Sequence, residues 1–392
     1  GYAVVKKPEG YTTAKVDQII QEYEKKSANE QQSTAKQYPN IITVVNETFA
    51  DIKVLGDFKT NEDYMPYFHS LKKNCVTGYT YASIVGGQTA NTEFELLTGN
   101  TLGFLSAGTT AFQLYIHGQM PSLVSNLKAE GYSGNKAMHP FNPYNYNRPA
   151  VYKDFGFTDF IDKFDFPKNV KRVREYISDE ANVDRIISEY EKNRKKTDQP
   201  FYMYNMTIQN HSPYDKDAAN FKQPIKIESS KYDAEANRYL NLIKYSDDSL
   251  KQLTSYFEKC KEPTIILFLG DHQPRLTDEF MNKITNGQYQ TWSSEQMMKR
   301  YQVPFVIWAN YDIKEQHIEK TSMNYIQSIL TKTAGVKMTG YQRFLNEVRK
   351  EVPTITSQGY WGKNGKFYQI NDKGSPYYGI IQKYRMIQYN MM

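Results

Sequence analysis

Three short apolar runs that each end in polar side chains constrain the fold of this 392-residue chain more than any other feature. The runs cover residues 41–45, 201–208 and 264–269 and are rich in β-branched and large apolar side chains. Such runs are typical of strands buried on both faces of a parallel sheet. Because ligands bind beyond the carboxyl ends of parallel strands, we expect the polar residues that follow the runs to converge: Asn46-Glu47, Asn210-His211 and Asp271-His272.

The segments between these runs have the spacing of helices. Residues 183–194 and 239–259 carry apolar side chains three and four positions apart, and residues 13–36 have the pattern of a surface helix leading into the domain. A further strand is predicted at residues 303–309. This alternation of strands and helices predicts an α/β fold with a mainly parallel central sheet and helices on both faces.

The residue pattern of the sequence changes after about residue 350. The stretch "GYWGKNGKFYQI" places Asn364-Gly365 between two aromatic-rich runs, which is a strong hairpin signal. We therefore divide the chain into a catalytic domain at residues 1–350, with its lead-in helix, and a small antiparallel subdomain at residues 351–392. The subdomain is expected to cover one edge of the main sheet.

Composition excludes several classes of protein. The formal charge of +6 comes from 49 basic and 43 acidic residues without a dominant basic block, so nucleic acid is not an expected partner, whereas a membrane surface or an anionic polymer is compatible. No apolar run approaches the length of about 18 residues needed to span a bilayer, and Gly1 does not begin a signal peptide. Either the protein is soluble or it is a domain separated from an anchor. Cys75 and Cys260 form neither a zinc knuckle nor a redox pair, and two free thiols or one disulfide both fit.

The stretch "GGQTANTEFELLTGN" at residues 86–100 reads as a flexible turn that opens a helix. Two interpretations of its hydroxyls stay open. Thr89, or Thr92 after it, can be a helix cap. Alternatively Thr89 is a nucleophile, because the free N–H groups and the positive dipole end of a helix start attract phosphate.

The polar residues after the strands suit a metal. Glu47, Asp271 and His272 are ligands for Zn²⁺ or Mn²⁺, and an oxygen of Thr89 would complete a four-coordinate site. A divalent cation would lower the pKa of the Thr89 hydroxyl and activate it near neutral pH. The plainer alternatives are that Glu47 caps a turn and that Asp271 forms one.

Five blocks of the chain resemble the lipoteichoic-acid-synthase-like phosphoglycerol transferases, a branch of the alkaline phosphatase and sulfatase superfamily. In order, they are "NIITVVNETFADI", "GGQTANTEFELLTG", "NYNRPAVYKDFGFTDFID", "YNMTIQNHSPY" and "LFLGDHQP". They extend over residues 40–309, and their order makes the resemblance specific. The implied fold is sulfatase/alkaline-phosphatase-like, with the catalytic domain outside the cell membrane after several membrane helices.

The resemblance also implies the chemistry. A single Mn²⁺, with Zn²⁺ or Mg²⁺ as alternatives, would assist transfer of glycerol phosphate from phosphatidylglycerol, through a phosphothreonine, to a hydroxyl of a cell-wall polysaccharide or glycolipid. Carried over by motif, the metal-site residues are Glu47, Thr89, Asp271 and His272, with Thr89 as the nucleophile. The glycerol phosphate would be held by His139, Tyr146, Arg148 and His211.

Departures from the family pattern leave alternatives. Tyr146 stands where the polymerising synthases have Trp, and the sequence around His139 looks more like relatives that decorate streptococcal-type polysaccharides with glycerol phosphate. His139 can also be an exposed loop residue, and Arg148 can anchor its loop by a salt bridge. The rival functions are a lipoteichoic acid polymerase, a phosphoethanolamine transferase and a catalytically silent module that binds anionic polymers. A true sulfatase is disfavoured, because no Cys or Ser that could become formylglycine stands at the position of Thr89.

Three further histidines, His69, His117 and His317, lie in no motif. We expect them to be surface or capping residues.

Overall fold

The computed structural model describes residues 5–28 and 37–392, and its centre is an eight-stranded sheet of order β10-β2-β9-β8-β1-β7-β3-β4. The strands from β8 to β4 in this order run parallel to one another. They are β8 (Thr264–Gly270), β1 (Asn40–Asn46), β7 (Phe201–Met206), β3 (Ser133–Met138) and β4 (Asp159–Ile161). The strands predicted at residues 41–45, 201–208 and 264–269 are therefore adjacent, with β1 in the middle.

The other side of the sheet mixes directions. β9 (Gln302–Ala309) is the predicted strand at residues 303–309, and it runs antiparallel to both β8 and β2 (Cys75–Tyr81). The edge strand β10 (Gln316–Ser322) pairs in parallel with β2. Among the described strands of this sheet, β9 alone opposes the rest, so the sheet is mainly parallel as predicted.

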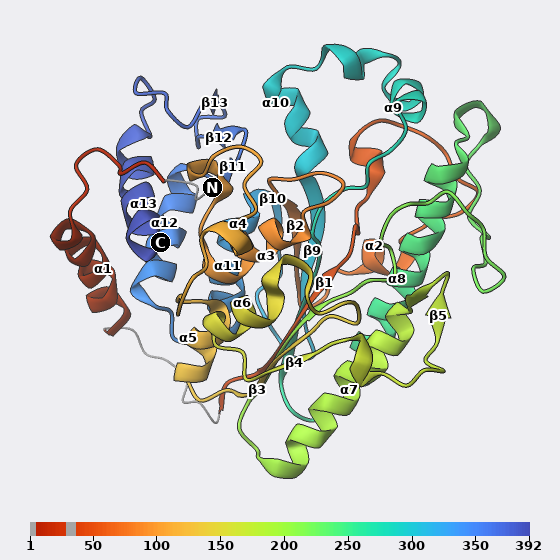
Figure 1. Ribbon diagram of the computed structural model, residues 1–392, viewed down its shortest axis with the longest axis horizontal. Helices are drawn as coiled ribbons and strands as arrows, with labels where there is room; N and C mark the ends of the chain where they lie inside the picture. Colours follow the sequence, from red (N-terminus) through yellow and green to blue (C-terminus); the bar gives the residue numbers. More distant parts are fainter. Residues whose placement is uncertain (1–4, 29–36) are drawn as a thin grey trace.

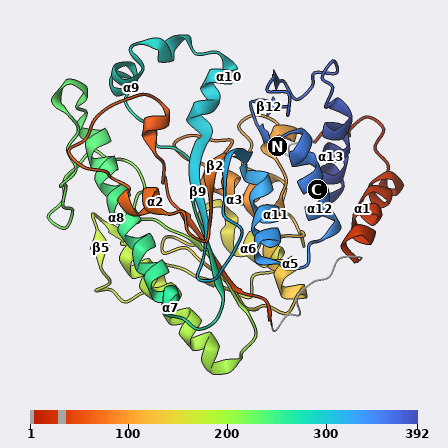
Figure 2. The same ribbon diagram turned by 180° about the vertical axis from the view of Figure 1, so that it is seen from behind.

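Both faces of the sheet are covered by helices (Figures 1 and 2). In β1, Ile41 and Val45 join one core cluster, whereas Ile42 and Val44 join the other, as the two-residue period of a strand requires. The first cluster packs against α3 (Thr89–Thr98), α4 (Ala111–Leu114), α5 (Leu123–Ala129), α6 (Arg148–Phe155), α11 (Met323–Ala334) and α12 (Gly340–Glu351). The second packs against α2 (Pro66–Ser70), α7 (Asp179–Lys196), α8 (Ala234–Glu258) and α9 (Asp278–Thr285).

The lead-in helix lies outside these layers. It is α1 (Thr13–Ala28), which packs on α12 through the edge-to-face rings of Tyr23 and Phe344, 5.5 Å apart. The predicted continuation to residue 36 lies outside the described residues. The short helix α10 (Ser294–Met297) precedes β9.

The C-terminal segment begins with a small antiparallel sheet of β11 (Thr354–Thr356), β12 (Gly359–Trp361) and β13 (Phe367–Tyr368). The predicted hairpin turn is present, with Gly365 at φ +81° between β12 and β13. β11 contacts the edge strand β10. The chain then forms α13 (Tyr378–Met391), which buries Ile381 and Tyr384 in the first core cluster. The division into two domains at residue 350 stays a prediction.

A two-stranded hairpin, β5 (Arg172–Val173) with β6 (Tyr176–Ile177), projects ahead of α7. None of the helices within residues 5–28 and 37–392 is both long and apolar enough to cross a membrane. The predicted fold class is confirmed: an α/β protein with a mainly parallel sheet, helices on both faces and a small C-terminal antiparallel sheet.

Candidate functional site

Two neighbouring strands deliver the polar residues of the site. Asn46, the last residue of β1, pairs with Gly270, the last residue of β8, so Glu47 and Asp271 leave the sheet side by side. Gly270 is required there, because a Cβ atom at this position would lie 1.8 Å from the backbone oxygen of Phe49. The close approach of the two loops thus depends on a glycine at the end of β8.

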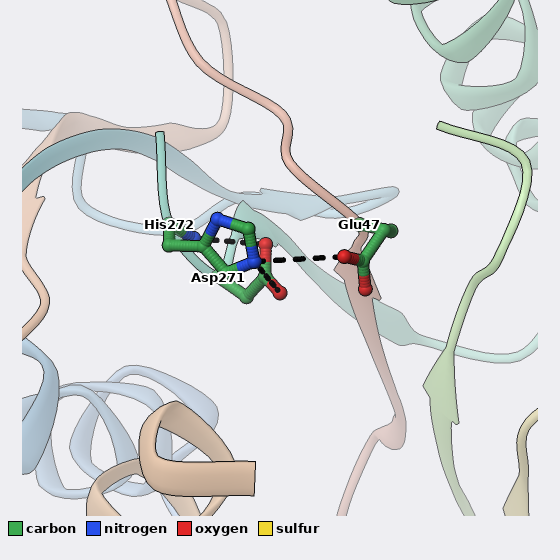
Figure 3. A group of neighbouring side chains, drawn as sticks. All are labelled: Glu47, Asp271 and His272. Carbon is green, nitrogen blue, oxygen red and sulfur yellow. Dashed lines mark hydrogen bonds and ion pairs between the residues drawn. The ribbon is translucent and has the colours of Figure 1, made fainter. Parts of the chain in front are cut away.

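Glu47, Asp271 and His272 form a compact buried group (Figure 3). One ligand atom from each lies within 4.8 Å of the others. His272 Nε2 is 3.5 Å from Glu47 Oε1 and 3.2 Å from Asp271 Oδ2. All three residues are less than 5% exposed. The convergence expected from the strand ends is therefore present in the structure.

Burial and mutual charge set the protonation of this group. Burial, followed by the negative charge of Glu47, raises the pKa of Asp271 to about 7. Burial also opposes ionisation of Glu47, but the close contact with His272 and its charge outweigh it and lower the pKa of Glu47 to about 2. Burial works against the imidazolium of His272 as well, yet the two carboxylates raise its pKa to about 9. The group holds two acids against one base, a charge pattern that favours an added cation.

Two buried atoms of the group, Asp271 Oδ2 and His272 Nε2, contact each other as an ion pair at 3.2 Å but form no hydrogen bond of standard geometry with the described residues. The other oxygen of Asp271 is fully used, because it accepts the backbone N–H groups of Thr48, at 2.7 Å, and of His272, at 2.8 Å. A divalent cation held by Glu47, Asp271 and His272 would give both of these atoms a bond. This donor set of carboxylates and one imidazole suits Zn²⁺ or Mn²⁺.

Thr89 opens α3 beside this group. Gly86 at φ +74° and Gln88 at φ 58° turn the chain sharply before the helix. The side chain of Gln88, at the N-cap, makes no capping hydrogen bond and accepts instead from the Asn91 side chain at 3.3 Å. Instead the Thr89 hydroxyl donates to Glu47 Oε2 at 3.4 Å, and Thr92 donates to the backbone oxygen of Asp271 at 2.8 Å. Neither hydroxyl caps α3, and both tie the helix start to the loops after β1 and β8.

The two motif histidines lie on the β7 side of the group. His139 is 3% exposed, so the alternative of an exposed loop residue is wrong. Its Nδ1 donates to the backbone oxygen of Met206 at 2.9 Å, and burial, then the charge of Arg148, lowers its pKa to about 3. His139 is therefore neutral, with Nε2 left as an acceptor. His211 lies close enough to act electrostatically on Glu47.

Arg148, at the start of α6, is buried in an ion pair with Glu93 of α3. Its Nε and Nη2 donate to Glu93 Oε2 at 3.2 and 2.9 Å, and Tyr146 places its ring 5.2 Å from the guanidinium carbon. Arg148 thus forms the salt bridge that one of the two interpretations of this residue expected. Sequence reasoning missed Glu93 as its partner, although a glutamate next to Phe94 in a helix that is buried all round needs a partner.

The remaining histidines make local contacts. His69 bridges Asp51 and Asp63, His117 bonds the backbone oxygen of Leu114, and His317 bonds Thr77. The two cysteines are free, with Cys75 buried.

Comparison with known proteins places this geometry in context. The chain is 31% identical over 368 residues to a Rhizobium meliloti protein whose name links it to cyclic β-1,2-glucan modification, covering 92% of this chain and 56% of the relative. It is 27% identical over 237 residues to the lipoteichoic acid synthase-like YvgJ of Bacillus subtilis, covering 59% of this chain and 36% of that protein. The chain thus spans only part of the length of these relatives.

The fold matches that of the Streptococcus pyogenes phosphoglycerol transferase GacH, solved in complex with sn-glycerol-1-phosphate. The TM-score is 0.79 at 20% identity, covering 100% of this chain and 96% of that chain. The resemblance to the lipoteichoic-acid-synthase-like branch is confirmed by these comparisons. Residues 39–336 match the family model described as Sulfatase, and the chain belongs to the sulfatase family.

Proposed function

We propose that this chain is the catalytic domain of a metal-dependent phosphoglycerol transferase that uses Thr89 as its nucleophile. One observation carries the proposal. The Thr89 hydroxyl does not cap its helix and instead donates to Glu47, one of three buried residues whose ligand atoms lie within 4.8 Å of one another and suit a cation. The fold shared with a phosphoglycerol transferase and the sulfatase-family match support the same reaction class.

In the proposed reaction, the Thr89 oxygen attacks the phosphorus of the donor lipid, and the bond from phosphorus to the diacylglycerol oxygen breaks. The proton lost by Thr89 ends on that leaving oxygen. An acceptor hydroxyl then attacks the phosphothreonine, and Thr89 recovers a proton as its oxygen leaves. Glu47, with a pKa of about 2, stays ionised and orients the hydroxyl. A bound cation would supply the activation, because a free threonine hydroxyl is a poor nucleophile at neutral pH.

The residues around Thr89 have distinct tasks in this proposal. His139 offers a neutral Nε2, fixed because its Nδ1 is bonded to a backbone oxygen. Arg148 supplies a permanent positive charge, and its pKa stays above its ordinary value through Glu93. Tyr146 covers that guanidinium with its ring. Together with His211, these groups would bind the phosphate and exclude water from it.

We further propose phosphatidylglycerol as the donor and a cell-wall polysaccharide or glycolipid hydroxyl as the acceptor, with Mn²⁺ as the metal and the domain on the outer face of the cell membrane. The likeness to GacH and to YvgJ supports this choice. A relative named for glucan modification favours single additions to a polysaccharide over polymerisation. Two free cysteines argue against the disulfide-rich phosphoethanolamine transferases, and the intact site argues against a silent binding module.

The test is to trap the covalent step. Metal-loaded protein is incubated with phosphatidylglycerol without acceptor, and the chain is digested and analysed by mass spectrometry. We expect glycerol phosphate on the peptide that contains Thr89, with Thr89→Ser also labelled and Thr89→Val unlabelled. Labelling of another residue, or release of product by Thr89→Val at the wild-type rate, would contradict the proposed nucleophile.

A further inference from the structure

We propose that a groove beside the substrate histidines docks on the surface of an anionic phospholipid bilayer and receives the lipid end of the donor. The groove has a volume of about 600 Å³. Its lining includes Phe141, Lys163, Phe164, Lys168, Arg172 and Tyr176, and we call it the 141–176 groove. The inference rests on the proposed function, since it supplies the route by which a lipid donor reaches the phosphate site.

Two aromatic residues of the groove lining contact the histidines of the proposed phosphate site. The ring of Phe141 in its wall lies against His211, with centroids 6.1 Å apart and an angle of 23°, and against His139 at 6.0 Å. Tyr176 approaches the same His211 ring at 5.7 Å. A phospholipid whose phosphate lies at the histidines would therefore direct its glycerol and acyl portion along Phe141.

The outer rim presents an unusual aromatic side chain. Phe164 is 73% exposed, at the centre of a short helical turn at Lys163–Asp165. The ammonium of Lys163 lies 5.1 Å from the Phe164 ring and 5.9 Å from the Phe141 ring. An exposed Phe next to Lys is typical of a surface that enters the headgroup and acyl boundary of a membrane.

The charges at the groove complement an anionic surface. Lys163, Lys168 and Arg172 form no ion pair within the described part of the chain. Among the described residues that line the groove, Glu175 is the single acid. The nearby carboxylates of Asp162 and Asp165 are occupied, because each accepts a backbone N–H of the turn that presents Phe164. The basic side chains are therefore available to lipid phosphates, while the acids hold the local backbone.

The groove is also fixed to the active site. Arg174, in the β5–β6 hairpin, donates to the backbone oxygens of Gln209, His211 and Pro213, each at 2.8 Å. Docking of the hairpin on a bilayer would thus hold the His211 loop at a set height above the lipid phosphates. A neutral polysaccharide would gain little from an exposed Phe flanked by unpaired cations, so the observations favour the lipid.

The test is vesicle binding by the 392-residue chain, measured by co-sedimentation. We expect binding to phosphatidylglycerol vesicles, weak binding to phosphatidylcholine vesicles, and loss of binding at about 1 M salt, where the Debye length is about 3 Å. Each basic residue near an anionic surface adds about fivefold to affinity, so Lys168→Glu with Arg172→Glu should weaken binding about 30-fold or more. Phe164→Ala should weaken it about tenfold.

A matched control separates the effect of losing basic residues in the groove from the effect of lowering the net charge of the protein. Lys195→Glu with Lys259→Glu makes the same charge change in exposed residues where α7 and α8 end, remote from the strand ends that carry the site. This control should bind vesicles as the wild type does. Equal losses in both double variants, or wild-type binding by Lys168→Glu with Arg172→Glu, would overturn the proposal.

Turnover distinguishes this inference from the proposed function. With a water-soluble nitrophenyl ester of glycerol phosphate, Phe164→Ala and Lys168→Glu with Arg172→Glu should keep wild-type rates, whereas with phosphatidylglycerol vesicles their KM should rise. Vesicle binding tests the role of the groove even if the protein turns over no substrate. In that case the proposed function fails, but the proposal for the groove does not. Wild-type vesicle affinity together with lost acceptor-stimulated turnover would assign the groove to the polysaccharide and overturn the lipid proposal.

Discussion

Two buried clusters of charged residues meet at α3. They differ in how completely their polar atoms are hydrogen-bonded. Glu93 accepts four hydrogen bonds, two from Arg148 and one each from Tyr152 and Tyr204. In the Glu47–Asp271–His272 group, Asp271 Oδ2 and His272 Nε2 instead meet only as an ion pair and form no standard hydrogen bond with the described residues. A complete network stabilises the fold and fixes Arg148, whereas an incomplete one that converges on a point indicates a site for a ligand.

Both clusters are joined through one helix. Thr89 and Glu93 stand four residues apart on α3, so they share a face. The proposed nucleophile and the carboxylate that holds Arg148, the arginine proposed to bind phosphate, are thus fixed to the same helix. Substitution of Thr89 should therefore mainly affect turnover, whereas substitution of Glu93 should mainly affect stability.

The largest effect is expected at Thr89. Thr89→Ala should reduce turnover by about a thousandfold or more, because no other group would form the covalent intermediate. The melting temperature should change little, since this hydroxyl does not cap α3. Turnover of a fluorescent phosphatidylglycerol analogue and thermal unfolding measure the two quantities.

Thr98→Ala, the same substitution in the last turn of α3, is the control. It removes a hydroxyl bonded to the backbone oxygen of Phe94 at 2.5 Å and should cost about 1 kcal/mol of stability with turnover retained. If Thr89→Ala behaves like Thr98→Ala, Thr89 has only a local structural role.

Substitution of Glu93, whose cluster is fully hydrogen-bonded, should mainly lower stability. Glu93→Ala would leave the buried Arg148 guanidinium without its partner, and breaking such a pair costs about 3–5 kcal/mol. Denaturant unfolding measures this loss. Glu93→Gln keeps acceptors for the tyrosines and should cost less, while KM rises because Arg148 is no longer held. A Glu93→Ala protein as stable as the wild type would remove the contrast between the two clusters.

At the incomplete cluster, adding metal should stabilise the protein. A cation that binds only the folded chain adds about 3 kcal/mol when its concentration is 100 times its Kd, so Mn²⁺ should raise the melting temperature and EDTA should reverse the rise. Asp271→Asn should abolish this response without lowering the stability of the metal-free chain, since it removes a buried carboxylate that Glu47 repels. Metal content is measured by elemental analysis, and an unchanged response in Asp271→Asn would contradict its role as a ligand.

The sequence predicted the parts of this molecule that depend on local pattern. β1, β7 and β8 are buried on both faces, so their apolar runs could be recognised, and the residues after them had to meet at one edge. β2 and β10 were missed. β10 is largely exposed, and its place beside β2 depends on pairing between segments about 240 residues apart.

In the candidate site, too, the residues placed by local pattern could be predicted, whereas those placed by long-range packing could not. Glu47, Asp271 and His272 follow strands, so their convergence could be derived from topology. The partner of Arg148 could not, because Glu93 lies on another helix 55 residues earlier and no local rule joins them. The groove at residues 141–176 depends on loops whose packing follows no sequence period.

The smallest effect concerns Glu95, the second buried carboxylate of α3, which forms no ion pair with the described residues. It is 1% exposed and accepts hydrogen bonds from Ser83, Thr101 and the backbone N–H of Leu102, while its Oε1 has no partner. Burial raises its pKa from the ordinary value of 4.5 to about 8. The folded protein therefore keeps a proton on Glu95 at pH values where the unfolded chain has released it.

The sign of the pH dependence follows from that difference. Between about pH 4.5 and pH 8 the folded state binds more protons at Glu95, so stability falls as pH rises, and above pH 8 the slope from this group vanishes. At about 1.4 kcal/mol per pH unit, the loss between pH 6 and pH 8 is about 2–3 kcal/mol. Glu95→Gln mimics the protonated acid and should be more stable than the wild type at pH 8 but not at pH 5. Denaturant unfolding at both values checks this, and parallel pH profiles for the two proteins would show that Glu95 is ionised in the fold.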